Sequence, residues 1–432
     1  MTRQYKDSGI EWIGQIPMDW KMQPLAIYFA ENSKSNSDLG SVNALQFKYG
    51  EIIQKPNNGK ELTDKDRELL EKYTVVSPDD IVVNGLNLNY DLKSLRIAKV
   101  REDGIITSAY IVLRPRNGAN ASFYNYYLKA LDFQKIFHGM GVGIRLTLSY
   151  DELRSMLLAV PSFEEQQRIA DYLDKKCAEI DGLIELQEQM IAQLTDYKQS
   201  VITEAVTKGL NPNAELIPSG IDWIGTIPKG WTIGRIKNVA VLYGRIGFRG
   251  YTSEDLNKDG EGAITLSPSN MLPMGMDYSN VTYLSWTKYY ESPEIMIQNN
   301  DLLMVKTGSS YGKVSYVNNL PREATINPQI LRIIPKISSK YLGYFMQSPI
   351  FLYQVEGGVV GGTIPTIAQE KINNFKIILP PEHEQLAIVS LLDTKCTEID
   401  SLISLKQQKI ENLKEYKKSI IFEAVTGKII ID

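Results

Sequence analysis

The sequence predicts an α+β protein with a pseudo-two-fold internal repeat, in which two α/β domains are separated by two long antiparallel helices. One observation is that "SGIEWIGQIPMDW" (8–20) recurs as "SGIDWIGTIPKGW" (219–231); we call these segments the tryptophan phrases. A second is that "PSFEEQQRIADYLDKKCAEIDGLI" (161–184) recurs as "PEHEQLAIVSLLDTKCTEIDSLI" (381–403). The residues between these segments match poorly. Each half therefore has matching ends around a variable middle, as expected of a duplicated unit.

The chain is predicted to contain four parts in order. The first domain covers 1–160, the first long helix 161–210, the linker and second domain 211–379, and the second long helix 380–432. The two variable middles contain short apolar runs broken by polar turns, which is typical of strands. Asp80 and Asp301 keep nearly the same offset as Pro115 and Pro335. We therefore expect the two middles to share one fold.

Both recurring segments at 161 and 380 are typical of long helices. A proline precedes each one, glutamates occupy the first turns, and no proline interrupts either for over forty residues. Apolar residues recur at alternating steps of three and four, which is the pattern of a coiled coil. This apolar seam is interrupted at equivalent steps by polar residues, namely Gln187, Lys198, Lys406 and Lys417. We expect the two helices to pack on each other; the alternative is that each packs on its own domain.

Composition excludes several classes of protein. No apolar run approaches the ~18 residues that a membrane span needs, so we expect a cytoplasmic protein without membrane contact. Two cysteines cannot form a disulfide framework, and two distant histidines without cysteine neighbours do not indicate a zinc site. Net charge is −4, but 21–160 and 232–379 are slightly basic, with 18 Lys and Arg against 16 Asp and Glu, and 14 against 11. Both helical segments are acidic, so the net charge does not exclude a polyanionic partner.

No catalytic motif is apparent. "GSSYGKV" (308–314) resembles a phosphate loop, but it is one residue short and has Val314 where a Ser or Thr should bind magnesium. The zinc-binding H-E-x-x-H motif is missing from the sequence. We therefore predict no catalytic residues and no metal ligands in this chain.

The two tryptophan phrases, together with "MLLAVPSFEEQQRIADYLD" (156–174) and "GGTIPTIAQEKINNFKIILPPEHEQLAIVSLLD" (361–393), resemble the specificity subunit of type I restriction-modification systems. The resemblance implies that each middle is a target-recognition domain for one half of a split, asymmetric sequence in double-stranded DNA. It also implies that the helices form a coiled-coil spacer and bind two methyltransferase (modification) subunits. This chain would then be a non-catalytic subunit without a cofactor of its own. S-adenosylmethionine would belong to the methyltransferases, and ATP and magnesium to separate restriction (translocase and endonuclease) subunits.

DNA contacts are expected on glycine-rich polar loops, because base readout needs donors and acceptors and phosphates need Lys and Arg. In the first domain the candidates are Asn84, Asn87, Asn89, Tyr90, Lys93, Arg96 and Arg145. In the second domain they are Arg245, Phe248, Arg249, Tyr251, Lys306, Ser309, Ser310, Tyr311, Lys313 and Thr363. The alternative for each stretch is an ordinary solvated turn.

Two other functions stay open from the residues themselves. A self-contained DNA methylase or nuclease would need a catalytic constellation, which we do not find. A coiled-coil scaffold for other proteins would not need two basic, glycine-rich, variable domains.

Overall fold

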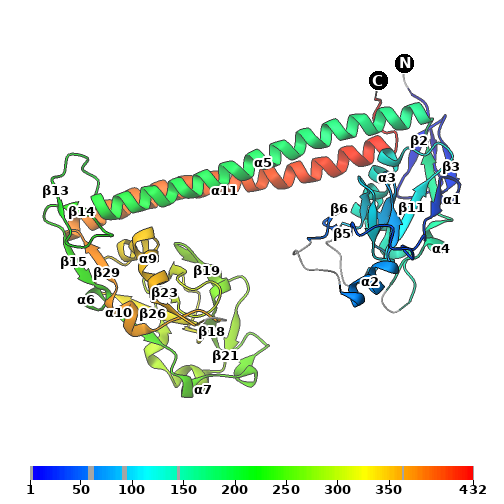
Figure 1. Ribbon diagram of the computed structural model, residues 1–432. Helices are drawn as coiled ribbons and strands as arrows, with labels where there is room; N and C mark the ends of the chain where they lie inside the picture. Colours follow the sequence, from blue (N-terminus) through cyan, green and yellow to red (C-terminus); the bar gives the residue numbers. More distant parts are fainter. Residues whose placement is uncertain (1–2, 57–62, 90–94, 144–145, 362–363, 432) are drawn as a thin grey trace. The chain divides into compact units, whose positions relative to one another are not determined.

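The computed structural model describes residues 3–56, 63–89, 95–143, 146–361 and 364–431 (Figure 1). It divides into two compact units, which we describe separately. Unit 1 consists of residues 1–188 and 407–432, and unit 2 of residues 189–406. Each unit contains one α/β domain and part of each long helix, and both chain ends belong to unit 1.

Each unit is built around a four-stranded antiparallel sheet with the same strand order. In unit 1 the order is β4 (Phe29–Glu31), β11 (Ile111–Pro115), β8 (Ile81–Val83) and β9 (Ile97–Lys99). In unit 2 it is β16 (Ala240–Gly244), β26 (Ile330–Pro335), β23 (Leu302–Val305) and β24 (Val314–Tyr316). The expectation of two related α/β domains is confirmed.

The smaller strand pairs also correspond between the units. Each tryptophan phrase supplies the connection and the second strand of a hairpin, β1 (Tyr5–Asp7) with β2 (Gln15–Pro17) and β13 (Leu216–Pro218) with β14 (Thr226–Pro228). The strand after each phrase pairs with the strand before a long helix, β3 (Lys21–Pro24) with β12 (Leu157–Val160) and β15 (Thr232–Arg235) with β29 (Lys376–Leu379). The units differ in a further sheet. It has two strands in unit 1, β7 (Thr74–Val76) and β10 (Gly104–Ile106), and five in unit 2, β17 (Leu256–Asn257), β21 (Thr282–Leu284), β18 (Ala263–Leu266), β25 (Ala324–Ile326) and β22 (Met296–Ile297).

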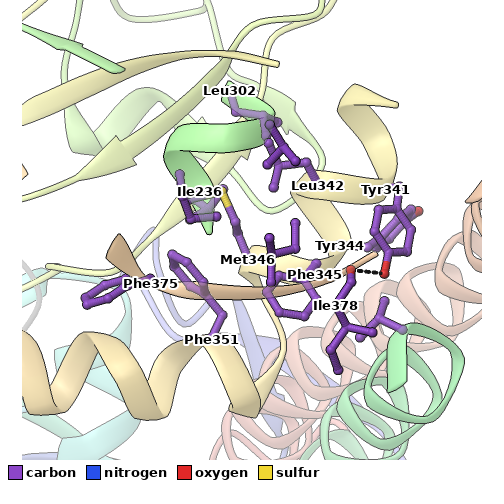
Figure 2. Close-up of a cluster of buried hydrophobic side chains, with 14 of the residues drawn as sticks. Ile236, Leu302, Tyr341, Leu342, Tyr344, Phe345, Met346, Phe351, Phe375 and Ile378 are labelled. Atoms are coloured by element: carbon purple, nitrogen blue, oxygen red, sulfur yellow. Dashed lines mark hydrogen bonds between the residues drawn. The ribbon is translucent and has the colours of Figure 1, made fainter. Parts of the chain in front are cut away.

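Helices cover the four-stranded sheets and close the cores. In unit 1 this helix is α3 (Ala121–Phe133), and in unit 2 the cover is α8 (Ser339–Met346) and α9 (Pro349–Gly358). Figure 2 shows the core of unit 2, where Phe345, Phe351 and Phe375 pack together. The buried Tyr341 hydroxyl donates to the Ile378 carbonyl at 2.8 Å, so its burial leaves no unsatisfied polar group.

The two long helices are α5 (Phe163–Lys208, 46 residues) and α11 (Glu382–Val425, 44 residues). They run antiparallel, and within each unit the start of one helix lies beside the end of the other (Figure 1). In unit 1, Leu173 and Cys177 of α5 share a core with Ile421 and Ala424 of α11 and with the domain. The helices thus pack both on each other and on the domains. Among the residues described, no helix is long and apolar enough to cross a membrane.

Two of the four polar interruptions of the seam form ion pairs between the helices. In unit 1, Lys417 Nζ lies 2.7 Å from an Asp181 carboxylate oxygen, and in unit 2, Lys198 Nζ lies 2.6 Å from Asp400. Each pair joins a lysine in the last quarter of one helix to an aspartate in the first half of the other. A register shift would separate both pairs, so they favour this one alignment.

The repeated tryptophans attach each domain to the helix ends. In unit 1 the buried Trp20 donates its indole N–H to Glu165 in the first turn of α5, at 2.9 Å. In unit 2 Trp231 donates to Glu384 in the first turn of α11, at 3.1 Å. Each ring also packs against the glycine that ends the opposite helix, Gly427 and Gly209 respectively. Both glycines have positive φ, as expected where a helix ends. The phrase occurs twice because each unit contains one such joint.

Candidate nucleic-acid interface

Three of the predicted loop stretches of unit 2 meet at one end of its four-stranded sheet. The turn between β23 and β24 contacts the segment before β28 (Thr366–Ile367), where Gly308 N–H donates to the Pro365 carbonyl at 3.0 Å. Thr307 and Thr366 form a bridge, and their hydroxyl oxygens lie 3.4 Å apart. The end of β16 lies on the other side, because a Cβ on Gly244 would stand 3.2 Å from Lys306 Nζ. The missing side chain of Gly244 leaves room for this lysine.

Unit 1 brings its two predicted loops together in the same way. The turn between β8 and β9 contacts the segment before α4 (Tyr150–Leu153), where Leu148 N–H donates to the Gly85 carbonyl at 2.9 Å. Leu88 N–H donates to the Leu146 carbonyl at 3.1 Å. A Cβ on Gly85 would stand only 2.4 Å from the Leu148 carbonyl oxygen. This glycine is therefore required by the close approach of two backbones.

Two predicted contact residues are buried, which corrects their expected role. Arg96 has only 1% of its surface exposed, and its guanidinium donates to the carbonyls of Asn84 and Leu86 at 3.0 and 2.8 Å. Arg245 is 6% exposed and donates to the Ile326 carbonyl and the Thr325 hydroxyl, at 3.1 and 3.0 Å. Both side chains hold loop and strand backbone in place. A direct DNA contact does not fit these buried positions, and the sequence could not reveal the burial.

The other candidates of unit 2 occupy varied surroundings. Ser309, Ser310 and Lys313 are exposed, and the Lys313 amine donates to the Pro268 carbonyl at 3.2 Å. Tyr311 is half-buried against the core. Lys306 is half-buried as well, and burial lowers the pKa of its amine. Among the described residues, no hydrogen bond or ion pair reaches Lys306 Nζ.

Arg249 and Tyr251 belong to a cluster around Arg245. The Arg245 guanidinium lies over the Tyr251 ring, 5.1 Å from its centre, and burial raises the pKa of that tyrosine. Arg249 Nη1 lies 3.6 Å from a Glu294 carboxylate oxygen. This cluster stabilises the segment after β16 rather than leaving two free cations.

In unit 1, Asn87 and Asn89 are exposed, whereas Asn84 is half-buried and accepts the Leu86 N–H at 3.2 Å. Asn87 has a φ of 52°, which asparagine tolerates better than most residues. The remaining candidates Tyr90, Lys93, Arg145 and Thr363, and the side chain of Phe248, lie outside the described residues.

Sequence reasoning missed one polar turn of this site, Asn327–Gln329. It connects β25 to β26 and joins the β23–β24 turn, because Lys306 N–H donates to the Gln329 carbonyl at 2.8 Å. It contains neither glycine nor a basic residue, the two signals used to choose the loops. An asparagine followed by proline directly after a buried strand is a turn signal that could have identified it.

The arrangement can bind a polyanion and present hydrogen-bonding groups. At the loop end of the unit 2 sheet lie side-chain hydroxyls, amides and amines, and at that of the unit 1 sheet lie the side-chain amides of Asn84, Asn87 and Asn89. Within the described ranges, no group of three or more His, Cys, Asp or Glu residues could hold a metal ion. Amides, hydroxyls and amines are the groups that contact phosphates and base edges.

Comparison with known proteins gives consistent matches. The family described as type I restriction modification DNA specificity domain matches residues 97–196 and 228–415, more than half of the chain. The type I restriction enzyme MjaVIII specificity subunit of Methanocaldococcus jannaschii is 24% identical over 376 residues, covering 83% of this chain and 82% of that protein. The putative MjaX specificity subunit of the same organism is 24% identical over 435 residues, covering 96% and 95%. A solved chain from work on complex assembly of the type I R-M system has a TM-score of 0.70 at 16% identity, covering 96% and 99%, which shows a common fold.

Proposed function

Because this chain belongs to the type I restriction-modification DNA specificity family, we propose that it recognises a two-part, asymmetric DNA sequence and directs modification and restriction subunits to it. Each unit recognises one part of the sequence. The observation that carries this proposal is the repetition of one scaffold with different loop side chains at the same end of its sheet. Two equal scaffolds with unequal surfaces suit two different half-sites better than one symmetric target.

The partners follow from the same proposal. The paired helices α5 and α11 hold two methyltransferase subunits, one for each equivalent part of the repeat. S-adenosylmethionine is bound by those subunits, and ATP and magnesium by the restriction subunits. This chain contributes the choice of sequence and no chemical step.

The test is a methylation assay with purified components. The chain is incubated with DNA and S-adenosylmethionine, alone and with the modification subunits of its system, and methylated positions are located by sequencing. We expect methylation at a single two-part sequence only in the complete mixture, and none with modification subunits lacking this chain. Methylation or cleavage by the chain alone would instead support a self-contained enzyme. A stable complex without sequence choice would support a scaffold.

A further inference from the structure

The turn that sequence reasoning missed contains a side-chain amide held in one orientation. Gln329 N–H donates to Asn327 Oδ1 at 3.0 Å, so that atom of Asn327 must be the oxygen. The other Asn327 atom is then Nδ2, and it donates to Gln329 Oε1 at 3.2 Å. The backbone N–H can only donate, so this chain of contacts determines which end of the Gln329 amide is oxygen and which is nitrogen.

Backbone hydrogen bonds and the strand that precedes it hold the turn in place. Asn327 N–H donates to the Leu266 carbonyl at 3.0 Å, and Ile330 N–H closes the turn on the Asn327 carbonyl at 3.2 Å. The buried Arg245 holds the preceding strand through Ile326 and Thr325. A Gln329 side chain on this support loses less freedom on binding than one on a mobile loop.

The outer side of the amide is open. Gln329 is exposed, and within the described part of the chain no hydrogen bond uses its Nε2. A Cβ on Gly308 would stand 3.4 Å from Nε2, so this glycine leaves the amide uncovered. Gln329 therefore presents its Nε2 amino group, with two N–H donors, beside the remaining acceptor position of Oε1.

Unit 1 has the same turn with a different side chain at its tip. There Thr107 follows β10 as Asn327 follows β25, Ala109 N–H donates to the Thr107 hydroxyl oxygen at 3.4 Å, and Tyr110 N–H donates to the Thr107 carbonyl at 3.3 Å. Ala109 stands at the position of Gln329. The backbone turn is thus common to both units, while the group it presents is particular to unit 2.

We infer that Gln329 recognises an adenine through the major groove in the half-site bound by unit 2, and that Asn327 is the positioning residue for it; this rests on the proposed function. Adenine presents an acceptor (N7) beside a donor (the N6 amino group), which matches the donor and acceptor of a glutamine amide. Guanine presents two acceptors, cytosine only a donor, and thymine an acceptor beside a methyl group. None of these three matches the fixed amide.

The experiment is selection of DNA from a library with both half-sites randomised, using the full chain assembled with its modification subunits. The wild-type assembly should select a two-part sequence with an adenine at one position of the unit 2 half-site. Gln329→Ala should reduce the preference for that adenine by about 5- to 150-fold, the equivalent of ~1–3 kcal/mol, and leave all other positions unchanged. Gln329→Glu has the same shape but only accepts hydrogen bonds, so it should change the preferred base to cytosine. Asn327→Ala should weaken the adenine preference without changing the base.

The matched variant in unit 1 is Ala109→Gln, which should alter one position of the other half-site only. Hydrogen exchange reports whether each variant keeps its fold, measured at the β25 and β26 segments for the unit 2 variants and at β10 and β11 for Ala109→Gln. If the wild type selects a two-part sequence and both Gln329 variants select the same one, this inference is wrong and the proposed function stands. A wild-type assembly that selects no sequence would overturn both. Loss of preference across a whole half-site in a folded Gln329→Ala protein would also overturn the inference, because one amide reads one base pair.

Discussion

Unit 1 and unit 2 contain the same arginine–aspartate pair in different surroundings. In unit 1, Asp80 accepts from Arg114 at 2.9 and 2.7 Å, and 44% of the arginine side chain is exposed. In unit 2, Asp301 accepts from Arg332 at 2.7 Å, and only 7% of that arginine is exposed. Arg332 also donates to the Glu294 carbonyl, in the segment before β22 of the five-stranded sheet.

The difference shows which parts of the repeat can change. The pair joins the two central strands of the main sheet, so it is present in both units. The segments that shield the pair from water lie outside that sheet, and these segments differ between the units. Burial raises the pKa of Asp301 even though Arg332 lowers it, so this pair is largely shielded from water. The framework is repeated, and the layers around it differ.

The largest effect should come from replacing a whole variable segment. Exchanging residues 21–160 for the corresponding segment of a relative should change every base of one half-site and leave the other half-site as it was. The hydrogen bond from Trp20 to Glu165, which attaches the domain of unit 1 to α5, lies outside the exchanged segment. Sequencing of methylated sites would show the result. Simultaneous change of both half-sites would break the comparison of independent units.

Replacing each of the two arginines by alanine tests how much burial of the arginine–aspartate pair contributes to the stability of each unit. Arg332→Ala leaves Asp301 buried without its cation, so we expect the free energy of unfolding of unit 2 to fall by about 3–5 kcal/mol. Arg114→Ala should cost unit 1 about 1–2 kcal/mol, because the arginine side chain is 44% exposed and water can take its place. Asp80 itself is only 2% exposed, but it keeps the Ser77 N–H and the Asn32 amide as hydrogen-bond donors. Hydrogen exchange of the β8 and β23 segments measures each unit separately. Equal losses would mean that burial of the pair does not matter.

Lys306 and Lys313 should differ in their contribution to DNA affinity. Changing both to alanine should weaken binding and flatten its salt dependence by roughly one unit of log–log slope for each phosphate that the variant no longer binds. Lys313 already donates to a carbonyl, whereas Lys306 is half-buried beside Gly244. We expect Lys306→Ala alone to account for the greater part of the weakening. A salt titration that gives the wild-type slope for the double variant would place this loop away from the DNA backbone.

The smallest effects should come from the ion pairs between the helices. Lys198–Asp400 and Lys417–Asp181 occupy equivalent positions, and both aspartates are more than half exposed. Each pair should contribute about 0.2–1 kcal/mol to stability, less at high salt. Double-mutant cycles with alanine at each pair give these values directly. Coupling energies that differ strongly would show that the repeat is less symmetric in the helices than we describe.

The sequence predicted the repeated parts closely because they are local. Helix boundaries follow from prolines, first-turn glutamates and apolar spacing, and the two helices lie within the predicted segments 161–210 and 380–432. The pairing of loops in each unit could also be predicted in part, since glycine-rich polar stretches after buried strands tend to meet at one end of a sheet. Asp80 and Asp301 have nearly the same offset as Pro115 and Pro335, which indicated a shared fold. The structure explains the two aspartates by the arginine that each one binds.

The burial of individual polar side chains and their hydrogen-bond partners could not be predicted from the sequence. Arg96 and Arg245 are of the residue type that commonly binds DNA. Only in the folded chain do backbone carbonyls surround their guanidinium groups. Gln329 carried no signal in the sequence, because its role depends on an asparagine two residues before it and a glycine twenty-one residues before it.

The duplicated domain and the two long amphipathic helices follow from the amino-acid sequence, because periodicity, turn residues and repeats are properties of residues along the chain. The tertiary structure alone decided which polar side chains stay available to a partner. A cation or amide is no longer available to a partner when a segment distant in sequence forms a hydrogen bond with it. Which segments come that close depends on the strand order of the sheet, here that of the strands between 240 and 335. Two units with nearly the same framework can therefore present different groups, Ala109 in one and Gln329 in the other, at the tip of the same turn.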